Sequence, residues 1–283
     1  MKKTIAFQGA YGANSNLACS KFYPSYEAVP YQSFFEVFEA VESSRADIGI
    51  IPLENSYAGR VSEIHNLLQK SQLYICAEHF FAVSHHLAGV AGSKIEDIKE
   101  VFSHPQALMQ CQNSLNKLSV IQNEFSNTAK AAQHISFLKN KNMGAICSKE
   151  AAIANDLIIL KENIQDSGQD NFTIFIVISK NQFDLDKEKS MVLTTLLFTI
   201  RNITGSLYKA LGGFATNNVN MIKLESYIPG GVSSEAKFFI TIEGHPSEKN
   251  VALALEELGF FSKNVKLLGV YYADRERVRS HSL

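Results

Sequence analysis

The first two-thirds of the chain alternate short apolar runs with amphipathic segments, and this alternation limits the folds that the chain can adopt. Between the apolar runs, apolar residues recur at helical spacing, as they do at Phe34, Val37, Phe38 and Val41. A repeated strand–helix–strand order predicts a mainly parallel sheet covered by helices. The strands are expected at 4–7, 47–53, 100–102, 118–122 and 143–147, and the helices around 33–41, 61–68, 105–115 and 127–138.

A polar and charged stretch, residues 179–190, separates this region from a different pattern. Beyond it, strand-like and helix-like segments follow the order β-α-β-β-α-β, which is the ferredoxin-like arrangement. These segments are expected at 192–199, 205–214, 219–227, 236–243, 248–258 and 265–272. The change of order predicts a second domain, and the residues from 274 onward are expected to form a polar, solvated tail.

Charge and hydropathy exclude several classes of partner. The chain carries 27 basic and 28 acidic residues and shows no basic stripe, so a nucleic-acid partner is not expected. No apolar stretch reaches the roughly 18 residues of a membrane span, and none near the start matches a signal-peptide core of about 7 residues or more. A cytoplasmic protein without a membrane partner is expected. No CxxC pair is present, so buried, reduced thiols are expected at Cys19, Cys76, Cys111 and Cys147.

Polar residues gather at five junctions between the expected elements. The junctions are 9–15 (GAYGANS), 52–56 (PLENS), 103–106 (SHPQ), 127–129 (NTA) and 170–173 (DNFT). In open α/β sheets, ligands bind at the carboxyl ends of strands and at helix N-termini, where unpaired N–H groups favour anions. Together the five junctions predict a cleft that hydrogen-bonds a small polar or anionic molecule.

Motifs of several enzyme classes are missing. There is no GxSxG elbow, Walker loop or HExxH helix, and Gly9 and Gly12 lack the third glycine of a dinucleotide fingerprint. His85 and His86 are consecutive, so on a strand they would point to opposite faces and could not easily share a metal. His104 precedes Pro105, which suits the first turn of a helix, so it is interpreted as a helix-start residue. Neither a metal nor another cofactor is expected.

Four segments resemble the prephenate dehydratase family in order and approximate spacing, and the last third resembles the ACT regulatory domain fused to those enzymes. The segments are 51–56 with Gly59, 103–111, 127–132 and 170–175, and the ACT-like motifs are 205–211 and 224–227. The resemblance implies a two-lobed α/β catalytic region of the periplasmic-binding-protein type II kind, followed by a ferredoxin-like ACT domain. The implied domains are 1–180 for catalysis, 181–190 as a linker, 191–273 for regulation and 274–283 as the polar tail.

The resemblance implies a lyase that removes carbon dioxide and water from prephenate to give phenylpyruvate in phenylalanine biosynthesis. It implies that Thr173 is essential and donates a proton or a hydrogen bond to the leaving hydroxyl. Asn55, Ser103 and Gln110 match polar residues that family members use in the same cleft. Further substrate contacts are expected at Gly9, Gly12, Ser15, Ser56, Thr128, Asn171 and Phe175. The product gains an aromatic ring, so the reaction requires no electron sink or metal.

One position departs from the family pattern, which usually has arginine after the essential threonine, whereas this chain has Ile174. Successive strand residues point to opposite faces, so Ile174 is expected to face away from Thr173, and an active enzyme is favoured. Two alternatives stay open. One is an arogenate dehydratase, whose substrate carries an amino group in place of the keto oxygen. The other is a catalytically silent protein that senses or binds an amino acid.

For the ACT-like part, the resemblance implies side-by-side pairing and a phenylalanine site that mediates feedback inhibition. Gly205 permits a close backbone approach at a helix N-terminus, which suits the carboxylate of an amino acid. The family's arginine-proline after Ser226 is Tyr227-Ile228 here. The pairing implies a homodimer or a homotetramer. The expected phenylalanine contacts are Gly205, Ser206, Leu207, Asn218, Asn220, Leu224, Glu225 and Ser226.

Overall fold

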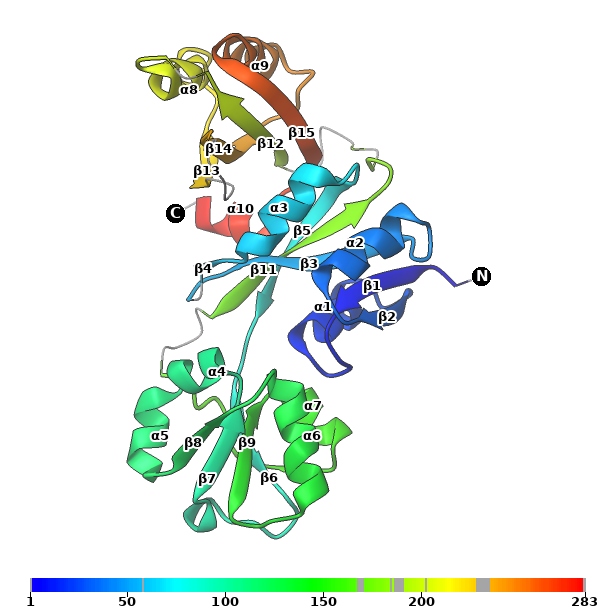
Figure 1. Cartoon of the computed structure of the whole chain (residues 1–283), viewed down its shortest axis with the longest axis vertical. Helices are drawn as coiled ribbons and strands as arrows, with labels where there is room; N and C mark the ends of the chain where they lie inside the picture. Colours follow the sequence, from blue (N-terminus) through cyan, green and yellow to red (C-terminus); the bar gives the residue numbers. More distant parts are fainter. Residues whose placement is uncertain are drawn as a thin grey trace. The chain divides into compact units, whose positions relative to one another are not determined.

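A computed structural model describes residues 2–57, 59–166, 171–183, 185, 191–201, 203–227 and 235–281. It contains two α/β sheets followed by an antiparallel sheet with two helices (Figure 1), so the expected fold class is confirmed. The chain forms two compact units, one of residues 1–37, 50–61 and 80–175 and one of residues 38–49, 62–79 and 176–283. Asp170, Ile228 and most of the expected linker lie outside the described residues.

The first sheet has the strand order β2-β1-β3-β11-β5, with the short strand β4 paired to β3. The chain leaves this sheet after β5 and returns to it with β11, which lies between β3 and β5. The strands are β1 (Thr4–Gln8), β2 (Glu27–Tyr31), β3 (Ile48–Asn55), β4 (Gly59–Arg60), β5 (Tyr74–Ala82) and β11 (Phe172–Ser179). The helices between them are α1 (Asn14–Phe22), α2 (Phe34–Glu42) and α3 (Ser62–Lys70).

The second sheet has the order β10-β6-β9-β7-β8, with α4 and α5 on one side and α6 and α7 on the other (Figure 1). Its strands are β6 (His86–Gly89), β7 (Glu100–Ser103), β8 (Ile121–Glu124), β9 (Met143–Cys147) and β10 (Ile158–Lys161). Its helices are the 3₁₀ turn η1 (Ile95–Asp97), α4 (Pro105–Gln110), α5 (Gln112–Leu118), α6 (Thr128–Leu138) and α7 (Lys149–Ala154).

The second sheet corrects the prediction of mainly parallel pairing. β7 pairs in parallel with β8 and β9, but β6 is antiparallel to both β9 and β10. Parallel pairing requires a crossover connection, usually a helix. The strands β7, β8 and β9 alternate with helices and satisfy this requirement, whereas β6 enters from β5 of the first sheet and is not consecutive in sequence with either of its neighbours, β9 and β10. The sheet is therefore mixed.

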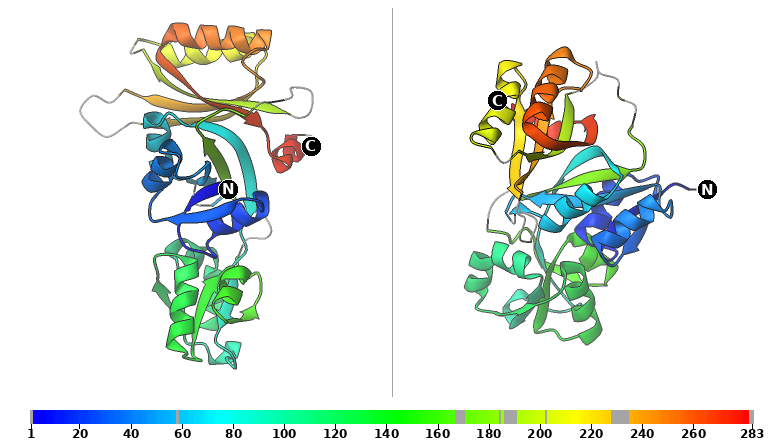
Figure 2. Two further views of the ribbon diagram at one scale, coloured as in Figure 1. Left: turned by 90° about the vertical axis from the view of Figure 1, so that its right-hand side faces the viewer. Right: turned by 45° about the horizontal axis from the view of Figure 1, so that its top comes forward.

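The third sheet has the order β13-β14-β12-β15, and all of its described pairings are antiparallel. Its elements are β12 (Val192–Ile200), α8 (Ser206–Thr216), β13 (Met221–Tyr227), β14 (Lys237–Glu243), α9 (Lys249–Phe261) and β15 (Ser262–Tyr272). Both helices cover one face of the sheet (Figure 2). Phe214 of α8 and Leu258 of α9 are fully buried against Phe198 and Ile240 of the sheet. The expected β-α-β-β-α-β order is confirmed.

The expected solvated tail is corrected by a final helix, α10 (Arg275–His281). The Arg277 side chain is only 16% exposed and forms an ion pair with Glu78 of β5. A buried carboxylate without a partner is energetically costly, so the ion pair of Glu78 with Arg277 holds the C-terminal segment against β5. Among the described residues, no helix combines the length and the apolar character that crossing a membrane would require.

Candidate functional site

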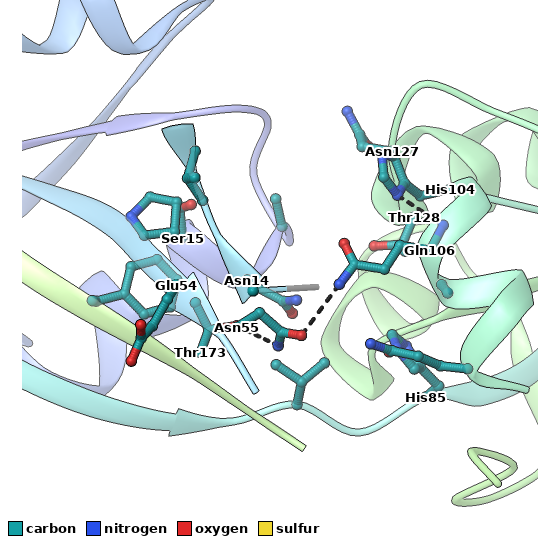
Figure 3. A pocket seen from close by; sticks show the side chains of 18 of the residues that line it. Asn14, Ser15, Glu54, Asn55, His85, His104, Gln106, Asn127, Thr128 and Thr173 are labelled. Atoms are coloured by element: carbon teal, nitrogen blue, oxygen red, sulfur yellow. Dashed lines mark hydrogen bonds between the residues drawn. The ribbon is translucent and has the colours of Figure 1, made fainter. Parts of the chain in front are cut away.

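An open pocket of about 280 Å³ lies in the first compact unit and collects residues from all five polar junctions (Figure 3). Most of its lining side chains are neutral and many are polar. The junctions contribute Ala13, Asn14, Ser15, Pro52, Glu54, Asn55, His104, Gln106, Asn127, Thr128 and Thr173. The remaining lining residues are Gly59, Arg60, Val61, Val83, His85, Ala107, Gln110 and Phe175.

Local sequence signals position these side chains at the ends of elements. Asn55 ends β3, and Thr173 is the second residue of β11. Asn127 caps α6 by accepting a hydrogen bond from the Lys130 N–H at 2.7 Å. His104 caps α4 in the same way, accepting from the Gln106 N–H, and Pro105 begins the helix. The interpretation of His104 as a helix-start residue is confirmed, although its ring also lines the pocket.

The Asn55 side chain lies at the centre of a polar network (Figure 3). Its Nδ2 group shares its two hydrogens among three acceptors, Thr173 Oγ1 at 3.2 Å and Asn171 Oδ1 and the Phe172 carbonyl at 3.0 Å each. Its Oδ1 atom accepts from Gln106 Nε2 at 3.2 Å. Because Thr173 Oγ1 accepts this bond, its own hydrogen remains available, and no acceptor for it is recorded among the described residues.

Gln110 presents an unused hydrogen-bond donor in the same pocket. Its Oε1 atom accepts from Asn171 Nδ2 at 3.0 Å and lies 2.7 Å from His85 Nε2. An amide oxygen cannot donate, so this contact places a hydrogen on His85 Nε2. The Nε2 group of Gln110 is buried and has no hydrogen-bond partner within the described part of the chain. An unpaired buried donor is costly, so a ligand oxygen at this position would remove an energetic penalty.

The two histidines of the pocket are neutral near pH 7. Burial lowers the pKa of His85, and the hydrogen bond to Gln110 opposes this effect without cancelling it. Burial also lowers the pKa of His104, against the opposing influence of Glu124. Sequence reasoning included Asn14 and Gln106 in the polar junctions without naming them as individual contacts, and it did not place His85 in the cleft. His85 meets Gln110 only through the tertiary fold, and the sequence carries no local signal for this contact.

Several residues expected at the substrate lie outside the set that lines the pocket. Ser103 is fully buried and donates to the Ile146 carbonyl at 2.6 Å. Ser56 binds the backbone of Phe172, and Asn171 lies behind the pocket between Asn55 and Gln110. Gly9 and Gly12 adopt positive φ angles of 118° and 83° in the turn before α1, conformations that favour glycine. These five residues do not line the pocket. Ser15, Thr128 and Phe175 do line it.

Ile174 has the orientation that strand alternation predicts. Thr173 and Phe175 line the pocket, whereas Ile174 between them does not and is only 5% exposed. An arginine in the same backbone position would therefore direct its side chain away from the pocket.

The expected phenylalanine contacts occupy several separate places in the second unit. Asn218 and Asn220 line a polar hollow of about 500 Å³ together with Glu243 and Glu248. Gly205 precedes α8 with a φ angle of 72°, and a side chain there would meet no atom within 4 Å. Ser206 and Leu207 begin α8, while Leu224 and Ser226 lie on the edge strand β13.

The Glu225 carboxylate on β13 is engaged within its own chain. Its oxygens lie 2.9 Å from His65 Nε2 and 3.3 Å from Lys223 Nζ. Burial alone would raise the pKa of Glu225, but the neighbouring His65 and Lys223 outweigh burial and lower it to about 2. The glutamate is therefore ionised at neutral pH and held by residues of α3 and β13.

The cysteines and the metal-ligating side chains of the described residues form neither a reactive thiol site nor a metal site. All four cysteines are buried and free, as expected. Burial raises the pKa of Cys76 to about 11 and that of the other three thiols to about 12, so the reactive thiolate is scarce at neutral pH. Among the described residues, no group of three or more His, Cys, Asp or Glu side chains is arranged to hold a metal ion.

Comparisons with known proteins identify the family. Residues 5–183 match the family model described as prephenate dehydratase. A "Bifunctional N-acyl-homoserine lactone acylase/prephenate dehydratase" of Komagataeibacter europaeus is 40% identical over 96% of each chain. An "Arogenate dehydratase/prephenate dehydratase 1, chloroplastic" of Arabidopsis thaliana is 37% identical over 98% of this chain and 74% of the relative.

A solved structure agrees with the sequence comparisons over both parts of the chain. It is the prephenate dehydratase of Arthrobacter aurescens in complex with L-Phe, which is 26% identical and superposes with a TM-score of 0.87. The superposition covers 95% of this chain and 90% of that structure, and so includes the C-terminal β-α-β-β-α-β region. The protein is a member of the prephenate dehydratase family of hydro-lyases and carries a C-terminal region with the fold of an ACT domain.

Proposed function

We propose that this enzyme converts prephenate to phenylpyruvate, carbon dioxide and water, with the pocket of the first unit as its active site. The observation that carries the proposal is that Asn55, Gln110 and Thr173 line one pocket, where Asn55 donates to the Thr173 hydroxyl and the buried amide of Gln110 has an unpaired donor. Neutral donors can orient a dianionic substrate without adding charge that must be neutralised. Ser103, Asn171, Ser56, Gly9 and Gly12 contribute indirectly in this proposal, by holding the pocket wall in place.

The chemistry requires two bonds to break in the substrate ring. The bond to the ring carboxylate breaks, carbon dioxide leaves, and the electron pair of that bond becomes part of the aromatic π system. The bond to the ring hydroxyl breaks with its electron pair on oxygen, which takes up a proton and leaves as water. In our proposal, Thr173 donates a proton or a hydrogen bond to this oxygen, while Asn55 orients the Thr173 hydroxyl.

The experiment that tests the proposal is the formation of phenylpyruvate from prephenate by the wild type, Thr173→Ala and Thr173→Ser. We expect Thr173→Ala to lower kcat by about 10²–10⁴-fold, the usual contribution of a positioned acid. Thr173→Ser keeps the hydroxyl and should retain most of the activity. A folded wild type that does not convert prephenate would refute the proposal, and equal activity of the alanine and serine variants would refute the role of the hydroxyl.

Arogenate is the second candidate substrate, because the Arabidopsis relative bears both enzyme names at 37% identity. The two substrates differ only where the keto oxygen is replaced by an amino group. The ratio of kcat/KM for prephenate and arogenate, measured with one enzyme preparation, decides between them. The name of the Komagataeibacter relative adds one further assay for the same preparation, the hydrolysis of an N-acyl-homoserine lactone.

We also propose that phenylalanine inhibits the enzyme by binding where two ACT domains pair, in a homodimer or homotetramer. The domain division in this proposal is 1–180, 181–190 and 191–273. The L-Phe complex of the Arthrobacter relative supports the choice of effector. The edge strand β13, which carries Leu224 and Ser226, and the exposed turn at Gly205 are the proposed pairing surface. Phenylalanine can shift the enzyme only if it binds one packing of the pair more tightly.

Light scattering and inhibition assays with and without phenylalanine test the regulatory proposal. A dimer or tetramer whose activity falls with phenylalanine supports it, and the variant Gly205→Val should weaken inhibition more than catalysis. An enzyme whose activity is the same at all phenylalanine concentrations would refute the regulatory proposal and leave the catalytic one intact.

A further inference from the structure

The lining of the catalytic pocket contains very little charge. Arg60 is the one arginine or lysine among its described lining residues, and Glu54 is the one acidic residue. Burial lowers the pKa of both lining histidines, so His85 and His104 add no positive charge near pH 7. Ile174 does not line the pocket and supplies no cation. A ligand with two carboxylates therefore meets a single cationic side chain.

The hairpin of β3 and β4 fixes the position of Arg60. In this hairpin Arg60 pairs with Glu54, and Gly59 pairs with Asn55, the residue that contacts Thr173. Glu54 lies directly opposite Arg60 in this register, an arrangement in which opposite charges attract. A guanidinium has five N–H donors in a planar fork, which is enough to serve Glu54 and a ligand carboxylate at once.

The two carboxylates of the proposed substrate place different demands on a cation. The ring carboxylate loses its charge as it becomes carbon dioxide. A strong cation bound to it would stabilise the ground state more than the transition state, and would slow the reaction. The carboxylate of the three-carbon side chain keeps its charge from substrate to product. A cation bound there holds the substrate in place without opposing the chemistry.

We infer that Arg60 binds the side-chain carboxylate, the one that the product retains. This inference rests on the proposed function, because it assumes a dicarboxylate that loses one carboxylate. The first residues of α1 and α6, Asn14, Ser15 and Thr128, line the same pocket. Helix N-termini carry a partial charge of about half a unit, which suits the carboxylate whose charge disappears. Arg60 thus contributes to the affinity for substrate and product more than to the chemical step.

The test compares Arg60→Gln and Arg60→Lys with the wild type. Arg45→Gln is the matched control, because Arg45 makes an exposed ion pair with Glu39 and does not line the pocket. The measurements are KM and kcat for prephenate and the equilibrium affinity for phenylpyruvate, the product. We expect Arg60→Gln to raise KM and to weaken phenylpyruvate binding by a similar factor of about 10–100, the usual effect of losing a hydrogen bond to a charged group.

Loss of the Arg60 guanidinium should affect substrate binding more than the chemical step. kcat should change much less than KM in Arg60→Gln, and Arg60→Lys should show a smaller loss, because it keeps the charge but not the fork. Arg60 is exposed on a two-residue strand, so we expect both variants to fold, and a thermal melt checks this.

Each alternative outcome overturns a different statement. A raised KM with unchanged phenylpyruvate affinity would mean that Arg60 binds the departing carboxylate, and the inference would be wrong. Unchanged values for both ligands would mean that Arg60 touches neither carboxylate. A wild type that converts neither prephenate nor arogenate would refute the proposed function before any variant is compared, and the inference would fall with it.

Discussion

The Nδ2 group of Asn55 donates a hydrogen bond of 3.2 Å to the hydroxyl oxygen of Thr173, across 118 positions of sequence. Because the Thr173 oxygen accepts from Asn55, the hydroxyl hydrogen is directed toward another acceptor. Asn55 is also tied to Asn171 and Gln106, so its amide cannot rotate without breaking other bonds. Asn55 thus orients the hydroxyl that we propose as the donor to the leaving group.

Asn55→Asp changes this relationship while nearly preserving the shape of the side chain. An ionised carboxylate cannot donate to Thr173 and adds a negative charge beside a dianionic substrate. We expect kcat/KM to fall by about 10²-fold or more, as for other losses of one preorganised donor. Asn140→Asp is the control, because Asn140 accepts from the Asn142 N–H at an exposed position and aspartate can do the same. Equal kinetics for the two variants would contradict the role of Asn55.

The sequence pattern predicted the elements with strong periodicity and missed those without it. The segment of α1, NSNLACSKF, is rich in serine and asparagine, and its apolar residues do not form a clear stripe. Strand β2 contains Pro30, which cannot donate to a sheet ladder. The strand is tolerated because β2 lies at the edge of its sheet. In β8, the predicted strand at 118–122 is displaced to Ile121–Glu124, because Leu118 belongs to α5 and Ser119 ends that helix in a left-handed conformation.

The sequence predicted which polar junctions form the candidate site. It was less successful in predicting which side chains of those junctions face the pocket. A polar residue after a strand or before a helix can be recognised locally, and this brought Asn55, Thr128 and Thr173 into one hypothesis. Which of these side chains face the pocket depends on how the elements pack. Ser103, for example, follows the same local pattern but directs its hydroxyl to the Ile146 carbonyl. Arg60 lies on the short strand β4 of a hairpin that the periodicity did not predict.

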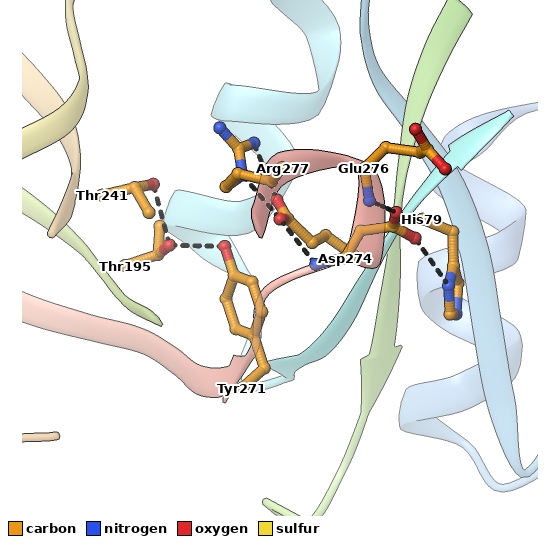
Figure 4. Close-up of polar contacts among 8 residues, drawn as sticks. His79, Thr195, Thr241, Tyr271, Asp274, Glu276 and Arg277 are labelled. Carbon is orange, nitrogen blue, oxygen red and sulfur yellow. Dashed lines mark hydrogen bonds and ion pairs between the residues drawn. The ribbon is translucent and has the colours of Figure 1, made fainter. Parts of the chain in front are cut away.

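The ion pair between Arg277 and Glu78 predicts an unequal effect of two arginine substitutions in α10 (Figure 4). Arg277 binds the carboxylate of Glu78 through two nitrogens, at 2.6 Å and 2.9 Å, and Glu78 is 3% exposed. Arg277→Ala leaves a buried charge without its partner, so we expect a loss of about 3–5 kcal/mol in the free energy of unfolding. Arg279→Ala, at an exposed pair with Glu276, should cost at most about 1 kcal/mol.

Urea denaturation of both arginine variants measures the difference. The additional substitution Glu78→Gln in the Arg277→Ala background removes the unpaired charge and should restore part of the loss. Equal stability of Arg277→Ala and Arg279→Ala would show that the Glu78 pair does not hold α10 in place.

Gly269 on β15 lies so close to the backbone of β5 that a side chain at this position is expected to clash. A Cβ atom at this position would overlap the carbonyl oxygen of Ile75 on β5, and the register of β15 against β12 shifts beside it. Glycine is therefore required for a close approach of two backbones. We expect Gly269→Ala to destabilise the protein by about 1–3 kcal/mol. Gly259→Ala is the matched control: it lies within α9 with no atom within 4 Å of a new Cβ, and should stabilise the helix by about 0.5–1 kcal/mol. Thermal unfolding of both variants should shift in opposite directions.

The pair of His65 and Glu225 predicts how stability depends on acid. The folded-state pKa of Glu225, about 2, lies below its ordinary value of 4.5, so the ionised form is favoured by folding. A carboxyl whose pKa is lowered by folding contributes stability that is fully present above the unfolded pKa. This contribution decreases as the pH falls from about 4.5 toward 2 and disappears below the folded pKa.

Glu225→Gln removes this titration and keeps the size of the side chain. We expect the difference in the free energy of unfolding between the wild type and Glu225→Gln to be largest above pH 5 and to shrink steadily below it. Glu276→Gln, at an exposed ion pair with Arg279, should give a small difference at every pH. Urea denaturation at several pH values between about 3 and 6 measures both differences. A Glu225→Gln difference that stays constant over this range would mean that the contacts of Glu225 with His65 and Lys223 do not favour its ionised form.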